Sequence, residues 1–244
     1  MPTRRFVGLT CTSLALTALV TSYAHAQQEE KLEDRAKAAA HVLANLVSDP
    51  KNSPPNGLLR SAVCIAVVPS VKEGAMIVGG KVGYGLAACR VGDGWSLPSY
   101  MALKAGSVGF QVGGQASDVV LIFTHADAPA LVASSNFELG GQASVAAGPV
   151  GSTIGAATDF KKGSAIYSYS TKGAGAFIGV SLAGTKYEVD DKGNRTTYPA
   201  ASVPTTTDKS PDVSYLVKTR AGKDTPPAVK PFISALEERI GSKR

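Results

Sequence analysis

The sequence has few of the residues that enzymes use most often for acid–base and metal chemistry. It contains three histidines and three cysteines among 244 residues. His41 and His125 are far apart, and neither has the neighbouring Cys, His or Asp spacing of a local metal site. The sequence therefore predicts no metal. An enzyme whose site is assembled from distant residues is kept as a minor alternative.

Motifs for nucleotides and for hydrolysis are also missing. The chain has no Gly-x-Ser-x-Gly elbow and no Gly-x-Gly-x-x-Gly turn. Gly79-Gly80-Lys81 resembles a phosphate loop only faintly, because Ala75 and Val82 stand where that loop needs glycine and Ser or Thr. We therefore expect a non-enzymatic protein without a cofactor.

The amino-terminal residues have the pattern of an export signal. Arg4 and Arg5 precede an apolar stretch over 6–20, and Ala24-His25-Ala26 matches the small-x-small cleavage pattern. The apolar stretch is shorter than the roughly 20 residues that a membrane-spanning helix needs. We expect cleavage between Ala26 and Gln27 and an exported protein of the periplasm or cell envelope.

Removal of this leader takes away two arginines and lowers the net charge from +6 to +4. A charge this small and dispersed does not favour nucleic acid, but it permits an anionic lipid as partner.

Two cysteines are left after cleavage, Cys64 and Cys89. An even number in an oxidising compartment favours one disulfide, which would close a loop of about 25 residues. The alternative is two separate buried thiols, since free cysteine packs like a small apolar residue.

Residues 29–47 predict an amphipathic helix. One face carries Leu32, Ala36, Ala39, Ala40, Leu43, Leu46 and Val47, and the other face is charged with both signs. Membrane-surface helices usually have a basic polar face and bulky apolar residues. The alanine-rich stripe here favours a helix that packs on its own domain over one that lies on a membrane.

Glycine is concentrated in the middle of the chain, where 21 of the 26 glycines lie between Val63 and Val189. Glycine at this density disfavours helices and is typical of turns and bulges in sheets. Only five charged residues occur from Ser99 to Phe160, which indicates a largely buried sheet. The predicted strands are 63–68, 75–82, 86–91, 100–105, 108–113, 119–124, 137–147, 165–170 and 176–182, with short helices over 58–62 and 126–134.

A short segment is repeated in this region. Residues 110–117 (FQVGGQAS) return as 137–144 (FELGGQAS), which predicts two equivalent strands bent at the Gly-Gly step. After Asp190, prolines and threonines predict a mostly irregular segment that ends in a helix over 231–240.

These patterns together predict a single α+β domain dominated by antiparallel, glycine-rich β-sheet, with helices at both ends and one interposed helix. The expected divisions are the leader over 1–26, the first helix and connector over 27–57, the β-rich core over 58–189 and the Pro/Thr-rich segment over 190–244.

Basic residues near turns are the candidate binding groups: Lys72, Lys81, Arg90, Lys161 and Lys162. If they gather on one rim of the sheet, they could hold anionic headgroups at about 1 kcal/mol per residue. The alternative is that loops simply end in solvated lysines. Trp95, in a Gly-Asp-Gly-Trp turn, is either an interface anchor or a partly buried hairpin aromatic.

Several stretches resemble a known family. The segments 66–74 (AVVPSVKEG), 77–80 (IVGG), 94–99 (GWSLPS), 106–115 (GSVGFQVGGQ), 118–121 (DVVL), 139–151 (LGGQASVAAGPVG) and 166–170 (IYSYS) are similar, in the same order, to the SYLF domain family. The resemblance covers about Leu58 to Leu182. It implies lipid binding, which eukaryotic members direct at phosphoinositides and bacterial members perform as exported proteins. Yeast members also bind actin, a partner that an exported protein is not expected to meet.

The leading hypothesis is therefore a lipid- or membrane-binding module of the bacterial envelope. A structural or protein-partner-binding envelope protein is the alternative.

Overall fold

The computed structural model describes residues 11–48, 52–73, 81–105, 117–134, 136–141, 144–149, 165–172, 176–180 and 182–241. For residues 11–28, 72, 73, 81, 136 and 172 only the backbone is described. The strands are β1 (Cys64–Glu73), β2 (Lys81–Val91), β3 (Gly94–Trp95), β4 (Ser99–Ala105), β5 (Ser117–Phe123), β6 (Asn136–Glu138), β7 (Val145–Ala147), β8 (Ile166–Lys172), β9 (Ala176–Gly179) and β10 (Lys186–Val189). The helices are α1 (Cys11–Ser48), α2 (Asn56–Ser61), α3 (Ala128–Ala133), α4 (Asp191–Thr197), α5 (Val213–Leu216), the 3-10 turn η3 (Pro227–Val229) and α6 (Lys230–Ile240).

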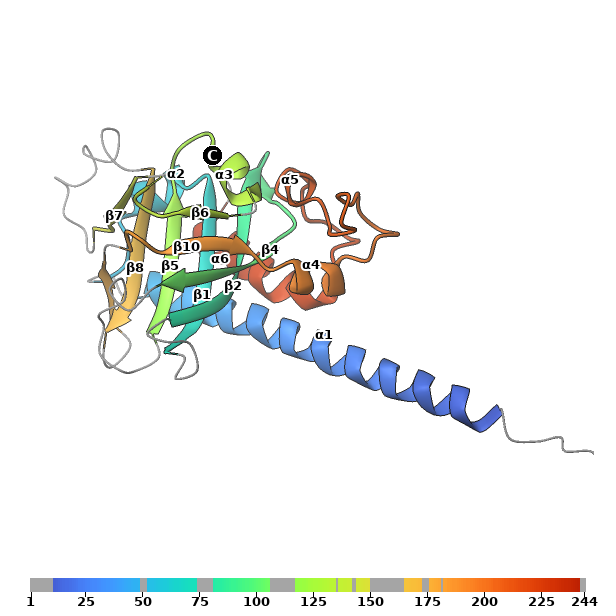
Figure 1. Cartoon of the computed structure of the whole chain (residues 1–244). Helices are drawn as coiled ribbons and strands as arrows, with labels where there is room; N and C mark the ends of the chain where they lie inside the picture. Colours follow the sequence, from blue (N-terminus) through green and yellow to red (C-terminus); the bar gives the residue numbers. More distant parts are fainter. Residues whose placement is uncertain are drawn as a thin grey trace, which may run out of the picture.

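The strands form one sheet in the order β6-β10-β4-β2-β1-β5-β8-β7, with β3 paired to β2 and β9 paired to β8 (Figure 1). All the described strand pairs are antiparallel except β7–β8. At one edge, β7 runs parallel to the first half of β8 and β9 runs antiparallel to its second half. The predicted α+β class is confirmed.

Helices cover both faces of the sheet because its side chains alternate between two cores. On one face, α1 and α6 lie side by side over apolar residues such as Ile65, Leu86 and Val120. On the other face, α3 and α5 pack over residues such as Val68 and Leu121.

The predicted amphipathic helix lies within α1 and packs on its own domain. Leu32, Ala36, Ala39, Leu43 and Leu46 are all buried in the core that α1 shares with α6. The first turns of α1 extend beyond the rest of the described chain in Figure 1. The packed interpretation of this helix, rather than the membrane-lying one, is therefore confirmed for its carboxyl-terminal half.

The single strand β2 covers a region where the sequence predicted two strands, 75–82 and 86–91. The two predicted strands are continuous here, because the chain between them, with Gly83 and Gly85, continues β2 where β1 bulges against it. A Cβ atom at Gly85 would approach the Val67 carbonyl oxygen to 2.1 Å, so only glycine fits this close backbone contact. The first part of the predicted strand 75–82, and all of 108–113, lie outside the described residues.

The predicted strand 137–147 is also wrong as a single element, because it divides into β6 and β7. Gly140 has a φ of +84° and turns the chain between them, as the Gly-Gly step predicted for this copy of the repeat. The first copy, over 110–116, lies outside the described residues, so their equivalence stays a prediction.

The segment after Asp190 is more ordered than predicted, since α4, α5 and η3 precede the expected terminal helix α6. Trp95 is 1% exposed and pairs in the β2–β3 hairpin, so of its two predicted roles the hairpin aromatic is correct.

Candidate functional site

All five lysines of the described strands lie at the same end of the sheet. Each is the first residue of its strand or one of the last two: Lys72 in β1, Lys81 in β2, Lys104 in β4, Lys172 in β8 and Lys186 in β10. The strand register makes the backbones neighbours, because Lys72 pairs with Val82, Val82 with Lys104, and Lys104 with Lys186. We call this region the lysine end.

Acidic residues share the lysine end and moderate its charge. Glu188 forms an ion pair with Lys104, and this hydrogen bond raises the pKa of the Lys104 ammonium group. Glu73, Asp118 and Glu138 also lie on strands at this end. Within the described part of the chain, the exposed side chain of Lys186 makes no ion pair.

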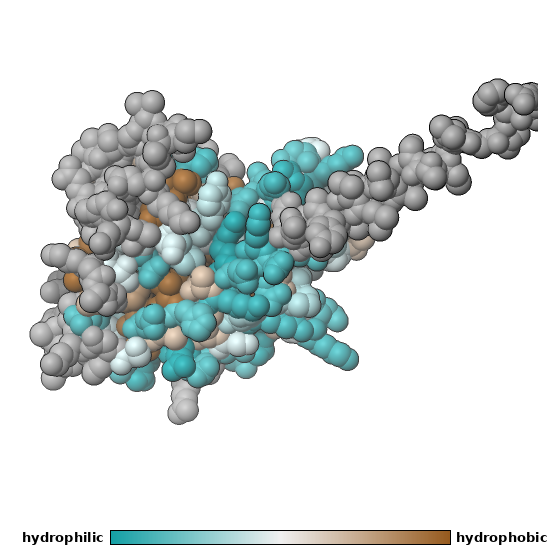
Figure 2. All heavy atoms as spheres, turned by 90° about the horizontal axis from the view of Figure 1, so that it is seen from below, coloured by the Kyte–Doolittle hydropathy of each residue, from teal (hydrophilic) through white to brown (hydrophobic). Residues whose placement is uncertain are grey.

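The arrowhead of β8 points toward the lower side of Figure 1, and Figure 2 views the molecule from below. The described surface on this side is mainly hydrophilic, with small hydrophobic areas next to the atoms drawn in grey.

A groove of about 400 Å³ lies beside the lysine end, between α1 and the strands β1 and β2. One side is formed by Lys31, Asp34, Arg35 and Ala38 of α1, and the other by Pro69 and Ser70 of β1 and residues 82–84 of β2. Val82 joins the two regions, since it lines the groove and pairs with Lys72 and Lys104.

A bulge in β1 shapes the strand side of this groove. Ser70 has a φ of +51°, a conformation that few residues other than glycine adopt. Its backbone N–H donates to the Asp118 carboxylate at 2.9 Å, and the β1 register shifts against both neighbouring strands at this point. The bulge turns Pro69 and Ser70 out of the regular ladder and leaves them on the groove wall.

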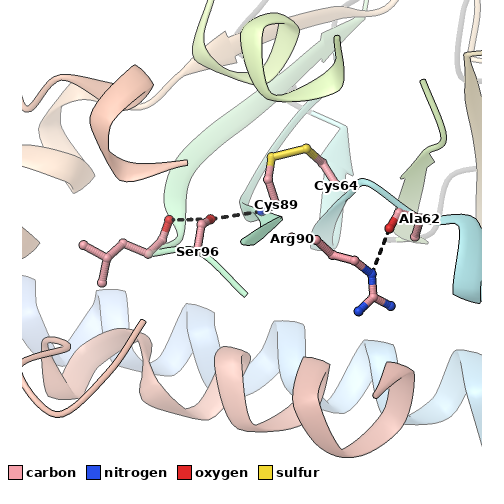
Figure 3. The surroundings of a disulfide bond; sticks show 6 residues. Ala62, Cys64, Cys89, Arg90 and Ser96 are labelled. Atoms are coloured by element: carbon pink, nitrogen blue, oxygen red, sulfur yellow. Dashed lines mark hydrogen bonds between the residues drawn. A yellow bond between two sulfur atoms is a disulfide. The ribbon is translucent and has the colours of Figure 1, made fainter. Parts of the chain in front are cut away.

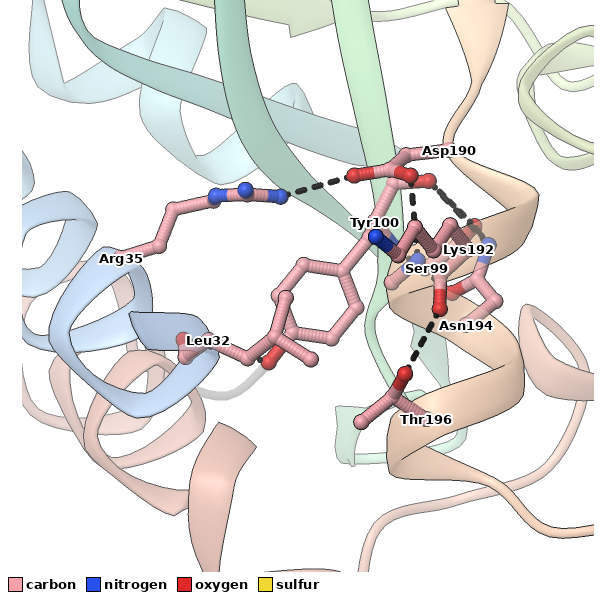
Figure 4. Close-up of polar contacts among 9 residues, drawn as sticks. Leu32, Arg35, Ser99, Tyr100, Asp190, Lys192, Asn194 and Thr196 are labelled. Carbon is pink, nitrogen blue, oxygen red and sulfur yellow. Dashed lines mark hydrogen bonds and ion pairs between the residues drawn. The ribbon is translucent and has the colours of Figure 1, made fainter. Parts of the chain in front are cut away.

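Arg35 forms the centre of the α1 side. Its guanidinium group lies 5.1 Å from the Tyr84 ring centre and 5.5 Å from that of Tyr100, and Nη1 donates to Asp190 at 2.8 Å. Figure 4 shows Arg35 reaching from α1 to Asp190 at the start of α4. Burial raises the pKa of the Tyr100 phenol to about 12, although the nearby Arg35 cation acts in the opposite direction.

Asp190 and Asn194 hold this arrangement in place. Asp190 also accepts from the backbone N–H of Gly193 and so caps α4. The buried Asn194 side chain accepts from the Tyr100 backbone N–H at 2.8 Å and donates to Ser99 Oγ (Figure 4). These contacts join α1, β4 and α4 across more than 90 residues of sequence, so no local pattern predicted them.

Arg90 is not grouped with the lysines, so the condition that all five basic candidates gather on one rim is not met. It lies at the opposite end of β2, where Nε donates to the Ala62 carbonyl at 3.0 Å and Nη1 to the Gly241 carbonyl at 2.8 Å. Its guanidinium group stacks over Trp95 at 4.5 Å, and burial lowers the pKa of this group. Arg90 thus connects α2, α6 and the hairpin.

Cys64 and Cys89 lie beside Arg90 (Figure 3). They are directly opposite each other in the β1–β2 register, both are fully buried, and their sulfur atoms lie 2.02 Å apart. This position is compatible with the predicted disulfide, whose formation in the purified protein stays a prediction.

The remaining candidates are not placed by the structure. Lys161 and Lys162 lie outside the described residues, and Ala26 and Gln27 lie in the part of α1 whose side chains are not described. Within the described ranges, no three His, Cys, Asp or Glu residues gather as metal ligands, and no helix there has the length and apolar character to cross a membrane.

Comparison with known proteins identifies related chains. The family described as "Ysc84: Las17-binding protein actin regulator" matches residues 104–239, more than half of the chain. The human SH3 domain-containing YSC84-like protein 1 is 31% identical over 161 residues, which are 63% of this chain and 46% of the relative. The rat protein of the same name has the same identity and 47% coverage. LAS seventeen-binding protein 3 of Saccharomyces cerevisiae is 32% identical over 176 residues, 68% of this chain and 38% of the relative.

The chain thus spans less than half the length of these relatives. The matched residues begin at the end of β4, include β5, and extend through the carboxyl-terminal segment into α6. The extent of this match, together with the resemblance over residues 58–182, shows that the chain belongs to the Ysc84 family, whose shared module is the SYLF domain.

Proposed function

We propose that this protein is a non-catalytic lipid- or membrane-binding module of the bacterial cell envelope that contacts anionic or phospholipid headgroups. The observation that supports this most directly is the lysine end, because strands distant in sequence bring their lysines to one end of the sheet. A lysine near an anionic membrane surface contributes about 1 kcal/mol.

The lysine end is better suited to a charged surface than to a small ligand. Its lysines come from five strands and lie along the end of the sheet instead of around one hollow. The carboxylates there, Glu188 among them, limit the net charge, so we expect moderate and salt-sensitive attraction.

The location is inferred from the leader. Arg4, Arg5 and the apolar stretch that follows them support export, and the family description supports a binding role without known catalysis. The family name refers to an actin regulator. Actin would not be the partner of a protein in the periplasm or envelope, so we assign the lysine end to lipid.

Co-sedimentation with vesicles tests this function. The protein should pellet with vesicles that contain phosphatidylglycerol, and the bound fraction should fall as salt is raised. Replacement of Lys104 and Lys186, the two lysines of this end whose side chains the structure describes, by Lys104→Gln with Lys186→Gln should weaken binding about tenfold or more. The matched control replaces two exposed lysines elsewhere, Lys223→Gln with Lys230→Gln, and should bind like the unchanged protein. Failure to pellet with either anionic or neutral vesicles would refute the function.

A further inference from the structure

The groove beside the lysine end carries charges of both signs on one wall. Lys31, Asp34 and Arg35 all line it from α1, where residues three and four positions apart are neighbours on the helix surface. This composition suits a ligand that carries both a positive and a negative group.

The cationic part of the wall has hydrogen-bond donors to spare. Arg35 uses Nη1 for Asp190, and the structure gives no other hydrogen bond from its guanidinium group to the described residues. Lys31 is exposed and makes no ion pair within the described part of the chain. Arginine and lysine together are well suited to the oxygens of a phosphate group.

The anionic part is Asp34. Its side chain is 66% exposed and lies 4.0 Å from the Lys37 ammonium group, the longest distance at which an ion pair is counted. Lys37 lies closer to Glu33, at 2.8 Å. Asp190, by contrast, is 14% exposed and already accepts from Arg35 and the start of α4. Asp34 is therefore the carboxylate available to a cationic group in the groove.

The strand side of the groove is mostly apolar. Tyr84 has the most exposed large apolar side chain in the described residues, at 46%, whereas Leu86 and Tyr100 beside it on the same face are fully buried. Tyr84 lies with Val82 and Pro69 along the groove. Arg35 already lies over the Tyr84 ring, so the exposed part of this side chain offers apolar surface that can pack against methylene groups.

We propose that this groove receives the headgroup of a zwitterionic phospholipid, with its phosphate at Lys31 and Arg35, its ammonium group at Asp34 and its methylene groups against Tyr84. The proposal rests on the lipid-binding function above and names the class of lipid. The lysine end would then supply general attraction to the membrane, and the groove would select a headgroup. A purely anionic headgroup is disfavoured in the groove because Asp34 lies within it and Asp190 beside it.

Titration with headgroup fragments, followed by NMR signals of Tyr84 and its neighbours, tests the proposal. The probes are phosphoethanolamine, ethanolamine and glycerol phosphate, each at concentrations up to tens of millimolar. Phosphoethanolamine should bind about fivefold or more tightly than either of the others, because only it engages both parts of the wall.

Two variants with opposite effects separate the charges. Asp34→Asn should weaken the binding of phosphoethanolamine, because it removes the partner of the ammonium group. It should strengthen the binding of glycerol phosphate, because it removes the carboxylate that repels an anion. Lys31→Gln should weaken the binding of both probes. The control Asp191→Asn, at an exposed acid of α4, should change neither affinity. Equal binding of phosphoethanolamine and glycerol phosphate, no response of Tyr84 to any probe, or an unchanged Asp34→Asn variant would overturn the proposal.

Vesicles distinguish this failure from that of the proposed function. We expect vesicles of phosphatidylethanolamine and phosphatidylcholine to be bound, with soluble phosphoethanolamine as a competitor. Binding to vesicles with phosphatidylglycerol alone would overturn the groove assignment and leave the lipid-binding function intact. Absence of binding to every vesicle would remove the lipid-binding function itself.

Discussion

The two ends of the β1–β2 pair use basic residues in different ways. At one end, Arg90 is half-buried, bonded to two backbone carbonyls and stacked on Trp95 beside the two cysteines. At the other, Lys104 is half exposed and Lys186 is exposed, and only Lys104 has an acidic partner among the described residues. The first end stabilises the fold, whereas the second leaves charge available to a ligand.

This difference shows that a basic residue near a turn has no fixed meaning in the sequence. Arg90 and Lys81 stand at opposite ends of the same strand, and nothing in their neighbouring residues separates them. What separates them is the packing of α2 and α6, whose carbonyl groups at Ala62 and Gly241 face Arg90.

The largest expected effect on stability is at the cysteine pair. If the disulfide forms, the double variant Cys64→Ala with Cys89→Ala should lose about 3–4 kcal/mol of unfolding free energy, from the loop of 25 residues that it closes. Urea unfolding of the oxidised protein and the variant measures this difference. Free thiols in the purified protein, detected by a thiol reagent after denaturation, would contradict the bond.

The next largest effect on stability should come from alkaline pH acting on the buried Tyr100. The pKa of Tyr100 is about 12 in the folded protein, above the usual value of 10, so its contribution is complete below pH 10. As the pH rises from 10 toward 12, the Tyr100 phenol ionises in the unfolded chain before it ionises in the folded protein. The free energy of unfolding should therefore fall by roughly 1 kcal/mol per pH unit.

Comparison with Tyr100→Phe isolates this contribution from those of other buried tyrosines. The difference in unfolding free energy between the two proteins should change between pH 9 and 11 if the phenol is responsible. A constant difference over that range would show that Tyr100 is not protected from ionisation.

Replacement of Arg90 should have a somewhat smaller effect. Arg90→Met removes two hydrogen bonds from a charged donor and the contact with Trp95, and we expect a loss of about 2 kcal/mol in urea unfolding. Arg220→Met is a suitable control because Arg220 is mostly exposed and pairs only with the exposed Asp93 in the described structure. Vesicle binding should be unchanged in both, and a loss of binding in Arg90→Met alone would place Arg90 in the functional surface after all.

The smallest effect on stability is expected at the lysine end. Lys104→Gln with Lys186→Gln should change the unfolding free energy by less than about 0.5 kcal/mol, because surface ion pairs contribute little. The same variant should reduce vesicle binding. A large loss of stability would mean that the two ends of the sheet are less different than the contacts indicate.

Apolar patterns in the sequence predicted the central elements well, because β1, β4, β5 and α6 bury the side chains that form their patterns. They missed β10, a four-residue strand in which only Tyr187 is fully buried. They also missed α4, whose residues Asp-Lys-Gly-Asn-Arg-Thr-Thr have no apolar pattern and depend on the Asp190 cap and on Asn194 bonding to β4.

The candidate site was predictable only in part. Lys72 and Lys81 were identified from turns, but Lys104 and Lys186 were not, because their proximity depends on the pairing of β4 with β10. The groove was also beyond prediction from sequence, since it combines α1 with a bulge in β1.

The edge formed by β7 and β9 has a consequence for solubility. The two strands have three and four residues and run in opposite directions along β8. A foreign strand that met this edge could match the direction of one of them but not of both. Short, interrupted edges are poor templates for growth of a sheet from one molecule to the next. In the residues that the structure describes, the topology of this edge thus gives the protein some protection from fibre formation.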